Sequence, residues 1–182
     1  MRRVISLFLP RWPSDRLRRK SKDFPSRDKP LVTAVMQGPR RVLASVDEAA
    51  EGLGLRCGMT VTHAQSLVPD LGLFDATLEA DEKALIRLAL WCVKYSPVVT
   101  PDPPSGVFID VAGSAHLFQG EAVLIKDLCR RLASEGISAR AALADTPGCA
   151  FANSCMDVTG LLYLLTVDVV SVAGVPPMAA AF

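Results

Sequence analysis

The stretch "PPSGVFIDVAGSAHLF", Pro103–Phe118, has the pattern of a turn, a short apolar strand and an exit rich in small residues. We expect the strand at Val107–Val111, where β-branched and aromatic residues follow the turn. One acid, Asp110, stands inside this otherwise apolar run. Its presence raises the question of whether it catalyses a reaction or holds the end of the strand.

The elements on either side of this strand predict the fold. Leu78–Tyr95 has the apolar stripe of a long amphipathic helix, and Glu121–Ser134 has that of a second one. Val4–Leu9 is a continuous apolar run typical of a buried strand, and Ile137–Leu143 alternates as a strand covered on one face does. We therefore expect an α+β fold of the ferredoxin-like kind, a mixed or antiparallel sheet with helices on one face.

A smaller lobe is expected between the first strand and the first long helix. Lys29–Met36 and Arg41–Val46 predict a hairpin that turns at Gly38-Pro39, and two short helices follow it. The expected domains are residues 1–10 with 78–158, an inserted lobe at 11–77, and an atypical tail at 159–182.

The composition limits which cellular compartment and which kinds of chemical site we expect. Half of the residues are apolar, which is enough for a core, and no apolar run is long enough to span a membrane. The apolar stretch near the N-terminus is too short for an export signal, so we expect a cytoplasmic protein. Five cysteines without metal-like or redox-like spacing predict reduced thiols, and with only two histidines we expect no metal site and no cofactor.

Charge is divided unevenly along the chain. Residues 1–42 carry a balance of +9 and residues 43–182 a balance of −8. A basic segment of this kind favours a polyanion such as DNA. The candidate phosphate contacts are Arg11, Arg16, Arg18, Arg19, Lys20 and Lys22. A solubilising helix face and a binding site for a partner protein remain equally open interpretations.

Several motifs, in this order, resemble the Y-family DNA polymerases of the DinB/UmuC group. They are "KPLVTAV", "EAAEGLGLRCGMTVTHAQSLVPDL", "YSPVV" and "FIDVAGSAHLF", and the resemblance covers roughly residues 3–155. It implies a palm sheet that begins the chain, an inserted fingers lobe, and a palm that then resumes. The tail would fall where a thumb starts, although it lacks the cations expected of a lobe that grips DNA.

The chemistry implied by the resemblance is two-metal phosphoryl transfer, which needs about three converging carboxylates. The positions implied for them hold Leu7 and Leu9 on the first strand, and Ser105 and Gly106 on the central one. None of these residues offers a carboxylate. Asp110 matches an acid that the family uses to hold the strand end, so we expect a structural role for it.

The nucleotide-binding positions depart from the family as well. Glu48 and Glu51 stand where the resemblance implies a Tyr and an Arg that grip the triphosphate, and like charges would repel it. Trp12 falls loosely at the position of the aromatic residue that excludes ribose. A substitute metal site built from Asp47, Glu48, Glu51 and Glu79 would need acids from different elements to converge.

The opening "RRVISLFLPRWPSDRLRR" is similar to that of an inactive branch of the family, the ImuB-like subunits of bacterial mutasomes. The resemblance implies a non-catalytic adaptor of the SOS response, active in translesion synthesis and induced mutagenesis. Its partners would be DNA, an error-prone replicative-type polymerase subunit, a RecA-like mutasome protein and the sliding clamp, with no membrane. The length of 182 residues suggests a fragment or truncated form. An active nucleotidyltransferase with relocated metal ligands and a non-functional truncated product are the alternatives.

Overall fold

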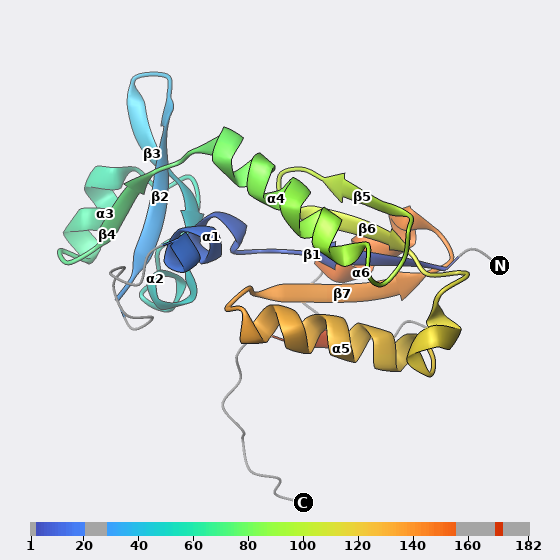
Figure 1. The fold of residues 1–182 in the computed structure, drawn as a ribbon. Helices are drawn as coiled ribbons and strands as arrows, with labels where there is room; N and C mark the ends of the chain where they lie inside the picture. Colours follow the sequence, from blue (N-terminus) through green and yellow to red (C-terminus); the bar gives the residue numbers. More distant parts are fainter. Residues whose placement is uncertain (1–2, 21–28, 156–169, 173–182) are drawn as a thin grey trace, which may run out of the picture. The chain divides into compact units, whose positions relative to one another are not determined.

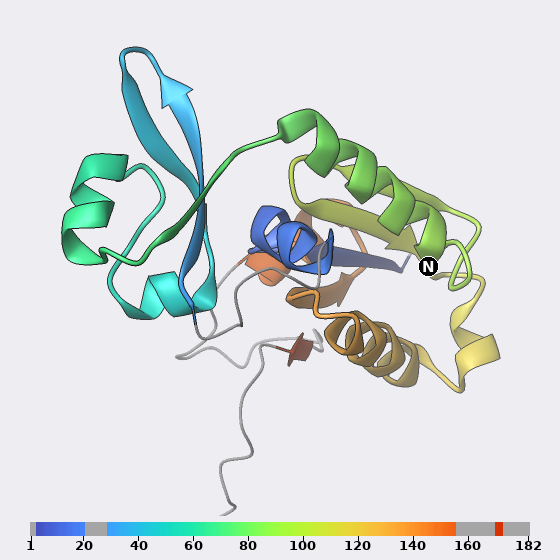
Figure 2. The same cartoon turned by 60° about the vertical axis from the view of Figure 1, so that its left-hand side comes forward.

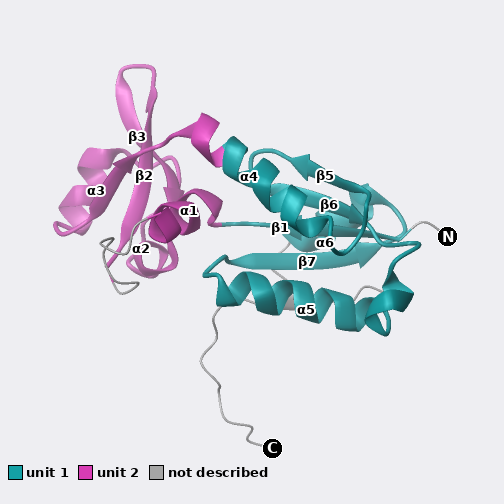
Figure 3. Cartoon of the chain, viewed as in Figure 1, with its two compact units in different colours: residues 1–10, 82–182 teal, residues 11–81 magenta. Residues whose placement is uncertain are grey.

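The chain forms two compact units, residues 1–10 with 82–182, and residues 11–81 (Figure 3). The structure, a computed structural model, describes residues 3–20, 29–155 and 170–172. The second boundary lies inside a helix, α4 (Leu78–Cys92), and so falls four residues beyond the one expected at 77/78. Apart from residues 170–172, the tail expected at 159–182 lies outside the described residues.

The first unit is a five-stranded antiparallel sheet with helices (Figure 1). Its strand order is β5-β6-β1-β7-β8, and each pair of neighbours is antiparallel. Its strands are β1 (Val4–Phe8), β5 (Val99–Asp102), β6 (Gly106–Asp110), β7 (Ala139–Ala144) and β8 (Val170–Val172). Besides most of α4, the unit contains the helices η1 (Ala115–Phe118), α5 (Glu121–Ser134) and α6 (Pro147–Cys155).

The central strand β1 is buried on both faces, as its unbroken apolar run predicts. Ser6 points to one face, where its hydroxyl lies 3.0 Å from that of Ser154 on α6. Ile5 and Leu7 alternate with it on the opposite face and are fully buried there. The expected α+β fold is therefore confirmed, and α6 adds cover on the face that the prediction left open.

Strand β5 was not predicted. The prolines around it suggested only an extended connector, yet residues 99–102 pair with β6. Pro101 is tolerated because β5 is the edge strand, where a missing N–H removes no bond from the sheet. This strand brings Asp102 opposite Gly106, a pairing that matters for the site.

The second unit packs helices against a three-stranded sheet of order β3-β2-β4. Its elements are α1 (Trp12–Lys20), β2 (Leu31–Gln37), β3 (Arg40–Val46), α2 (Glu48–Gly52), α3 (Val61–Leu67) and β4 (Gly72–Asp75). The predicted hairpin is β2–β3, whose turn contains Gly38 in the left-handed region at φ +59°. Strand β4 pairs in parallel with β2, and its four residues lack the alternation that would predict a strand.

Asp47 fixes the start of α2. Its carboxylate accepts hydrogen bonds from the Ala50 amide, at 2.9 Å, and from the Leu31 amide, at 3.1 Å. The first bond is an N-cap, and the second ties the helix start to the first residue of β2. Figure 2 shows the β2–β3 hairpin extending beyond α2 and α3 of the same unit.

Candidate functional site

Four positions correspond to metal ligands in the Y-family resemblance, and all four lie at one end of the five-stranded sheet. They are Leu7, Leu9, Ser105 and Gly106. In the β1–β6 ladder Leu7 is opposite Val107 and Phe8 is opposite Gly106. Just beyond the ladder, the Leu9 amide donates a 2.8 Å hydrogen bond to the Ser105 carbonyl. The structure thus brings the two sequence segments together, at the end of β1 and the start of β6.

The side chains present there do not fit a pair of Mg²⁺ ions. Leu7 and Leu9 are both fully buried and offer only hydrocarbon. Magnesium requires oxygen ligands in near-octahedral geometry, and two ions require several shared carboxylates. Ser105 has a neutral hydroxyl and Gly106 has no side chain, so the four positions supply no negative charge.

Gly106 has a specific steric role that sequence reasoning missed. A Cβ added at this position would lie 3.0 Å from both the carbonyl oxygen and a carboxylate oxygen of Asp102. Such distances force a neighbour to move, and one of the two neighbours is backbone. Asp102 therefore fills the space that a side chain at 106 would need, and it is the carboxylate that β5 brings to this end of the sheet.

Asp110 lies far along the strand from this place. It is paired with Val4, at the opposite end of β1 from Leu7 and Leu9. One of its carboxylate oxygens accepts a 3.1 Å hydrogen bond from the Ala112 amide, across the turn that follows β6. Its backbone carbonyl also accepts a hydrogen bond from the Ser96 hydroxyl. These contacts bind the strand end to the loops beside it.

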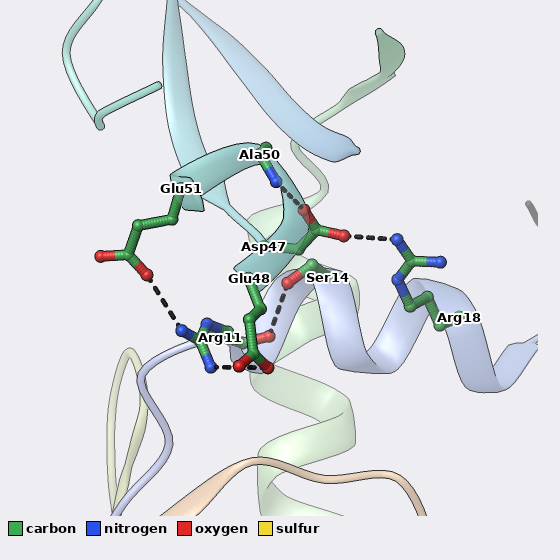
Figure 4. Close-up of polar contacts among 7 residues, drawn as sticks. All are labelled: Arg11, Ser14, Arg18, Asp47, Glu48, Ala50 and Glu51. Atoms are coloured by element: carbon green, nitrogen blue, oxygen red, sulfur yellow. Dashed lines mark hydrogen bonds and ion pairs between the residues drawn. The ribbon is translucent and has the colours of Figure 1, made fainter. Parts of the chain in front are cut away.

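In the second unit, Glu48 and Glu51 share one arginine (Figure 4). Arg11 donates to a carboxylate oxygen of Glu51 at 2.9 Å and to one of Glu48 at 3.4 Å. Helix α2 presents both acids on one side because they are three residues apart. The two carboxylates are thus partly neutralised by the segment that precedes α1, an arrangement that the sequence did not predict.

The predicted basic cluster does not form a single open surface. Arg16 pairs with Asp81, and Arg18 pairs with Asp47 and donates to the Lys29 carbonyl at 2.7 Å. The two arginine side chains are only 14% and 12% exposed. These cations, like Arg11, hold the unit together from within, so their part in the charge excess is largely compensated.

The remaining basic positions differ among themselves. Arg19 and Lys20 are exposed at the end of α1, where cations also complement the helix dipole. Lys22 lies outside the described residues. Trp12 is buried, with 2% exposed, and its indole N–H donates to the Asp81 carbonyl at 3.0 Å. It serves as a core residue of its own unit.

Within residues 3–20, 29–155 and 170–172, no three His, Cys, Asp or Glu side chains form a group able to hold a metal ion, and this includes the suggested set Asp47, Glu48, Glu51 and Glu79. None of the helices in this part of the chain is long and apolar enough to cross a membrane.

The two units have the fold of the palm and the fingers lobe of Y-family polymerases. Similar solved structures include the insertion ternary complex of Dbh DNA polymerase, with a TM-score of 0.65 and 18% identity, and DinB from Sulfolobus solfataricus, with a TM-score of 0.64 and 19% identity. Each match covers 78% of this chain and 42% of the other.

The chain belongs to the impB/mucB/samB family, whose model matches residues 17–152. It is 47% identical over 100 residues to protein ImuB of Caulobacter vibrioides NA1000, covering 55% of this chain and 22% of that protein. It is also 27% identical over 148 residues to DNA polymerase IV of Shewanella baltica, covering 80% of this chain and 41% of that one. The chain therefore spans less than half the length of these relatives.

Proposed function

We propose that this chain is a non-catalytic Y-family polymerase-like protein of DNA repair, an adaptor in error-prone translesion synthesis and damage-induced mutagenesis. The observation that carries the proposal is the register of β1 on β6. It brings Leu7 and Leu9 beside Ser105 and Gly106, which supply no carboxylate for metal ions. Identity to an ImuB protein, higher than to a DNA polymerase IV, supports the same branch.

The second unit supports the proposal independently. Arg11 is held by Glu48 and Glu51, so its positive charge is already engaged by acids of the same unit. A nucleoside triphosphate would have to approach two carboxylates and compete with them for that arginine. Both units thus carry changes that disfavour nucleotidyl transfer.

Primer extension tests the proposal directly. The purified chain is incubated with a primed template, all four deoxynucleotides and either Mg²⁺ or Mn²⁺, with an active Y-family polymerase as positive control. We expect no incorporation above the protein-free blank. Asp102→Asn is the matched variant, because Asp102 is the carboxylate beside Gly106 that a relocated metal site would use. Incorporation that Asp102→Asn abolishes would establish the active alternative and overturn the proposal.

An adaptor of this kind would also contact DNA, weakly and in a salt-sensitive way. The surface we propose for it is the exposed end of α1, with Arg19 and Lys20. Arg19→Glu with Lys20→Glu should weaken binding of a labelled duplex, whereas Arg40→Glu with Arg41→Glu makes the same change of charge at two exposed positions of the β2–β3 hairpin and serves as the control. Arg16 and Arg18 are unsuitable for this test because replacing them would remove the ion-pair partners of the buried Asp81 and Asp47 and so destabilise the unit. Unchanged binding would remove this surface from the proposal. By resemblance, the protein partners would be an error-prone polymerase subunit, a RecA-like protein and the sliding clamp.

A further inference from the structure

A row of side chains crosses the end of the five-stranded sheet, on the face that α6 covers further along. The register pairs Asp102 of β5 with Gly106 of β6. Phe8 of β1 lies between Gly106 and Arg140 of β7 and is paired with each. Residues paired in this way point to the same face, and Phe8 shares the face of Ser6, two positions away on β1. The row therefore runs acid, glycine, aromatic and cation across four neighbouring strands.

The row is partly exposed, although its central strands are otherwise buried. Phe8 is the one residue of β1, and Arg140 the one residue of β7, that is not buried. Asp102 is also partly exposed. One of its carboxylate oxygens lies 3.0 Å from the point where a Cβ of Gly106 would stand, so the acid leans over the glycine. A ligand can therefore reach the acid, the ring and the cation from the same side of the sheet.

Two further aromatic rings adjoin the row. Phe108 is paired with Ser6, so it lies on the same face as Phe8 and is its diagonal neighbour on the next strand. The centroid of the Phe108 ring lies 6.5 Å from that of Phe151 on α6, and Phe151 is 44% exposed. Aromatic rings displayed on an antiparallel sheet are surfaces on which unpaired bases stack. The chemistry of this face therefore favours a flat, aromatic ligand.

We propose that this row binds an unpaired guanine of single-stranded DNA. The base stacks on the Phe8 ring and extends over Gly106. An ionised carboxylate only accepts hydrogen bonds, so Asp102 selects a base with two adjacent donors, and guanine has these at N1 and N2. Neighbouring strands are about 4.8 Å apart, so the Cα atoms of Asp102 and Arg140 are about 14 Å apart across three strand spacings. That span accommodates a nucleotide whose base edge meets the acid and whose phosphate meets the guanidinium.

An arginine of a partner protein is the competing ligand, because its planar guanidinium also stacks on rings and pairs with carboxylates. The row suits it less well, since Arg140 places a like charge beside Phe8. A pair of metal ions is disfavoured too, because the row contains a single carboxylate and two ions need several. A nucleotide engages the acid, the ring and the cation together, so it is the ligand we assign.

The inference deepens the proposed adaptor role and rests on it for the choice of DNA as the ligand. It concerns unpaired bases at the sheet of the first unit, whereas the duplex contact proposed above concerns Arg19 and Lys20 of the second unit. The two contacts differ in probe and in variant, so failure of one leaves the other standing.

Fluorescence anisotropy with short labelled oligonucleotides tests the inference on the full chain. Each probe is a run of about 12 deoxythymidines whose central position holds deoxyguanosine, deoxyinosine or deoxythymidine, and EDTA is present throughout. Inosine keeps the ring system and the N1–H of guanosine but lacks its N2 amino group, so it isolates one of the two hydrogen bonds. We expect the guanine probe to bind about fivefold or more tightly than the inosine probe, and the all-thymine probe to bind most weakly.

The decisive variants change the chemistry of the row with little change of volume. Asp102→Asn replaces one acceptor by a donor, so the preference for guanine over inosine should be lost. Phe8→Leu keeps an apolar side chain and removes the ring, so the Kd for the guanine probe should rise about fivefold or more. Asp70→Asn and Phe74→Leu make the same changes in the second unit and are the matched controls. Circular dichroism verifies folding, and Asp102→Asn decides alone if Phe8→Leu is unfolded.

Several results would overturn the inference. Equal binding of the three probes would leave only general DNA binding, and a guanine preference that survives Asp102→Asn would place its origin elsewhere. Binding that requires Mg²⁺ instead of EDTA would return the row to the metal-dependent alternative. A labelled glycine–serine peptide with one arginine is the probe for the competing ligand. If it binds more tightly than the guanine probe and depends on Phe8 and Asp102, the row belongs to a partner protein. Primer extension measures a different property and decides only the proposed function.

Discussion

Replacing Asp47 should strongly destabilise the second unit. Its carboxylate caps α2 through the Ala50 amide, accepts the Leu31 amide and pairs with Arg18. Asp47 is 5% exposed, so water does not easily replace it. Asp47→Ala removes the cap and leaves a buried amide and a largely buried guanidinium without this partner.

These losses are large relative to the stability of so small a unit. A lost N-cap costs about 1 kcal/mol, and a buried ion pair broken on one side costs about 3–5 kcal/mol in total destabilisation. A unit of 71 residues, 11–81, has a free energy of unfolding of about 4–10 kcal/mol. We therefore expect Asp47→Ala to remove about 4–6 kcal/mol and to leave the unit close to unfolding. Asp47→Asn keeps the cap and loses the charge, so about half of that loss is expected.

The two tryptophans allow each unit to be observed separately. Trp12 is buried in the second unit and Trp91 belongs to the first. In a Trp91→Phe background, urea unfolding followed by Trp12 fluorescence reports the second unit. Glu48→Ala is the control, because Glu48 is 63% exposed and should change the unfolding free energy by less than about 0.5 kcal/mol. A loss below about 1 kcal/mol for Asp47→Ala would refute the idea that this residue holds the lobe together.

Two further predictions concern the first unit. Leu7→Asp should unfold the first unit rather than create polymerase activity, because the new carboxylate would be fully buried among apolar neighbours. Far-UV circular dichroism and primer extension together check this prediction. A variant that is folded or active would contradict it. Acid should also weaken this unit. Hydrogen bonds from Arg131 and Arg130 lower the pKa of Asp127 to about 2, so its contribution is present above the ordinary carboxyl pKa and is lost as pH falls from about 4 towards 2. In a Trp12→Phe background, urea unfolding followed by Trp91 fluorescence between pH 2 and 6 should show a smaller dependence of the unfolding free energy on pH for Asp127→Asn, and an unchanged dependence would refute this role of Asp127.

The sequence predicted the elements whose packing repeats with a clear period. Helix α5 begins and ends where its apolar stripe does, at Glu121 and Ser134, and β1 matches its apolar run. Periodicity reveals which face of an element is buried, so it finds helices and strands that lie against one large core. Short strands such as β4 and β5 have too few residues to show a period. The prolines in and around β5 also argue against a strand, because proline cannot donate a backbone hydrogen bond.

The roles of the charged residues were harder to predict from the sequence. The sequence shows a run of cations in α1, but Arg16 pairs with Asp81 and Arg18 with Asp47, which are 65 and 29 residues away. No local pattern indicates such partners, because they meet only when the unit has folded. The apolar residues Leu7 and Leu9, at positions where the resemblance implies metal ligands, could be read from the sequence, whereas the fit of Asp102 against Gly106 needed the β5–β6 pairing.

The bridge from Arg11 to Glu48 and Glu51 ties the residue before α1 to one side of α2. The three-residue spacing of the two acids brings like charges together on a helix of five residues. Arg11 contacts both carboxylates, so it offsets a repulsion that α2 would otherwise carry alone. The arginine and the two acids are therefore useful to this lobe only as a set, and removal of any one of them changes what the other two contribute.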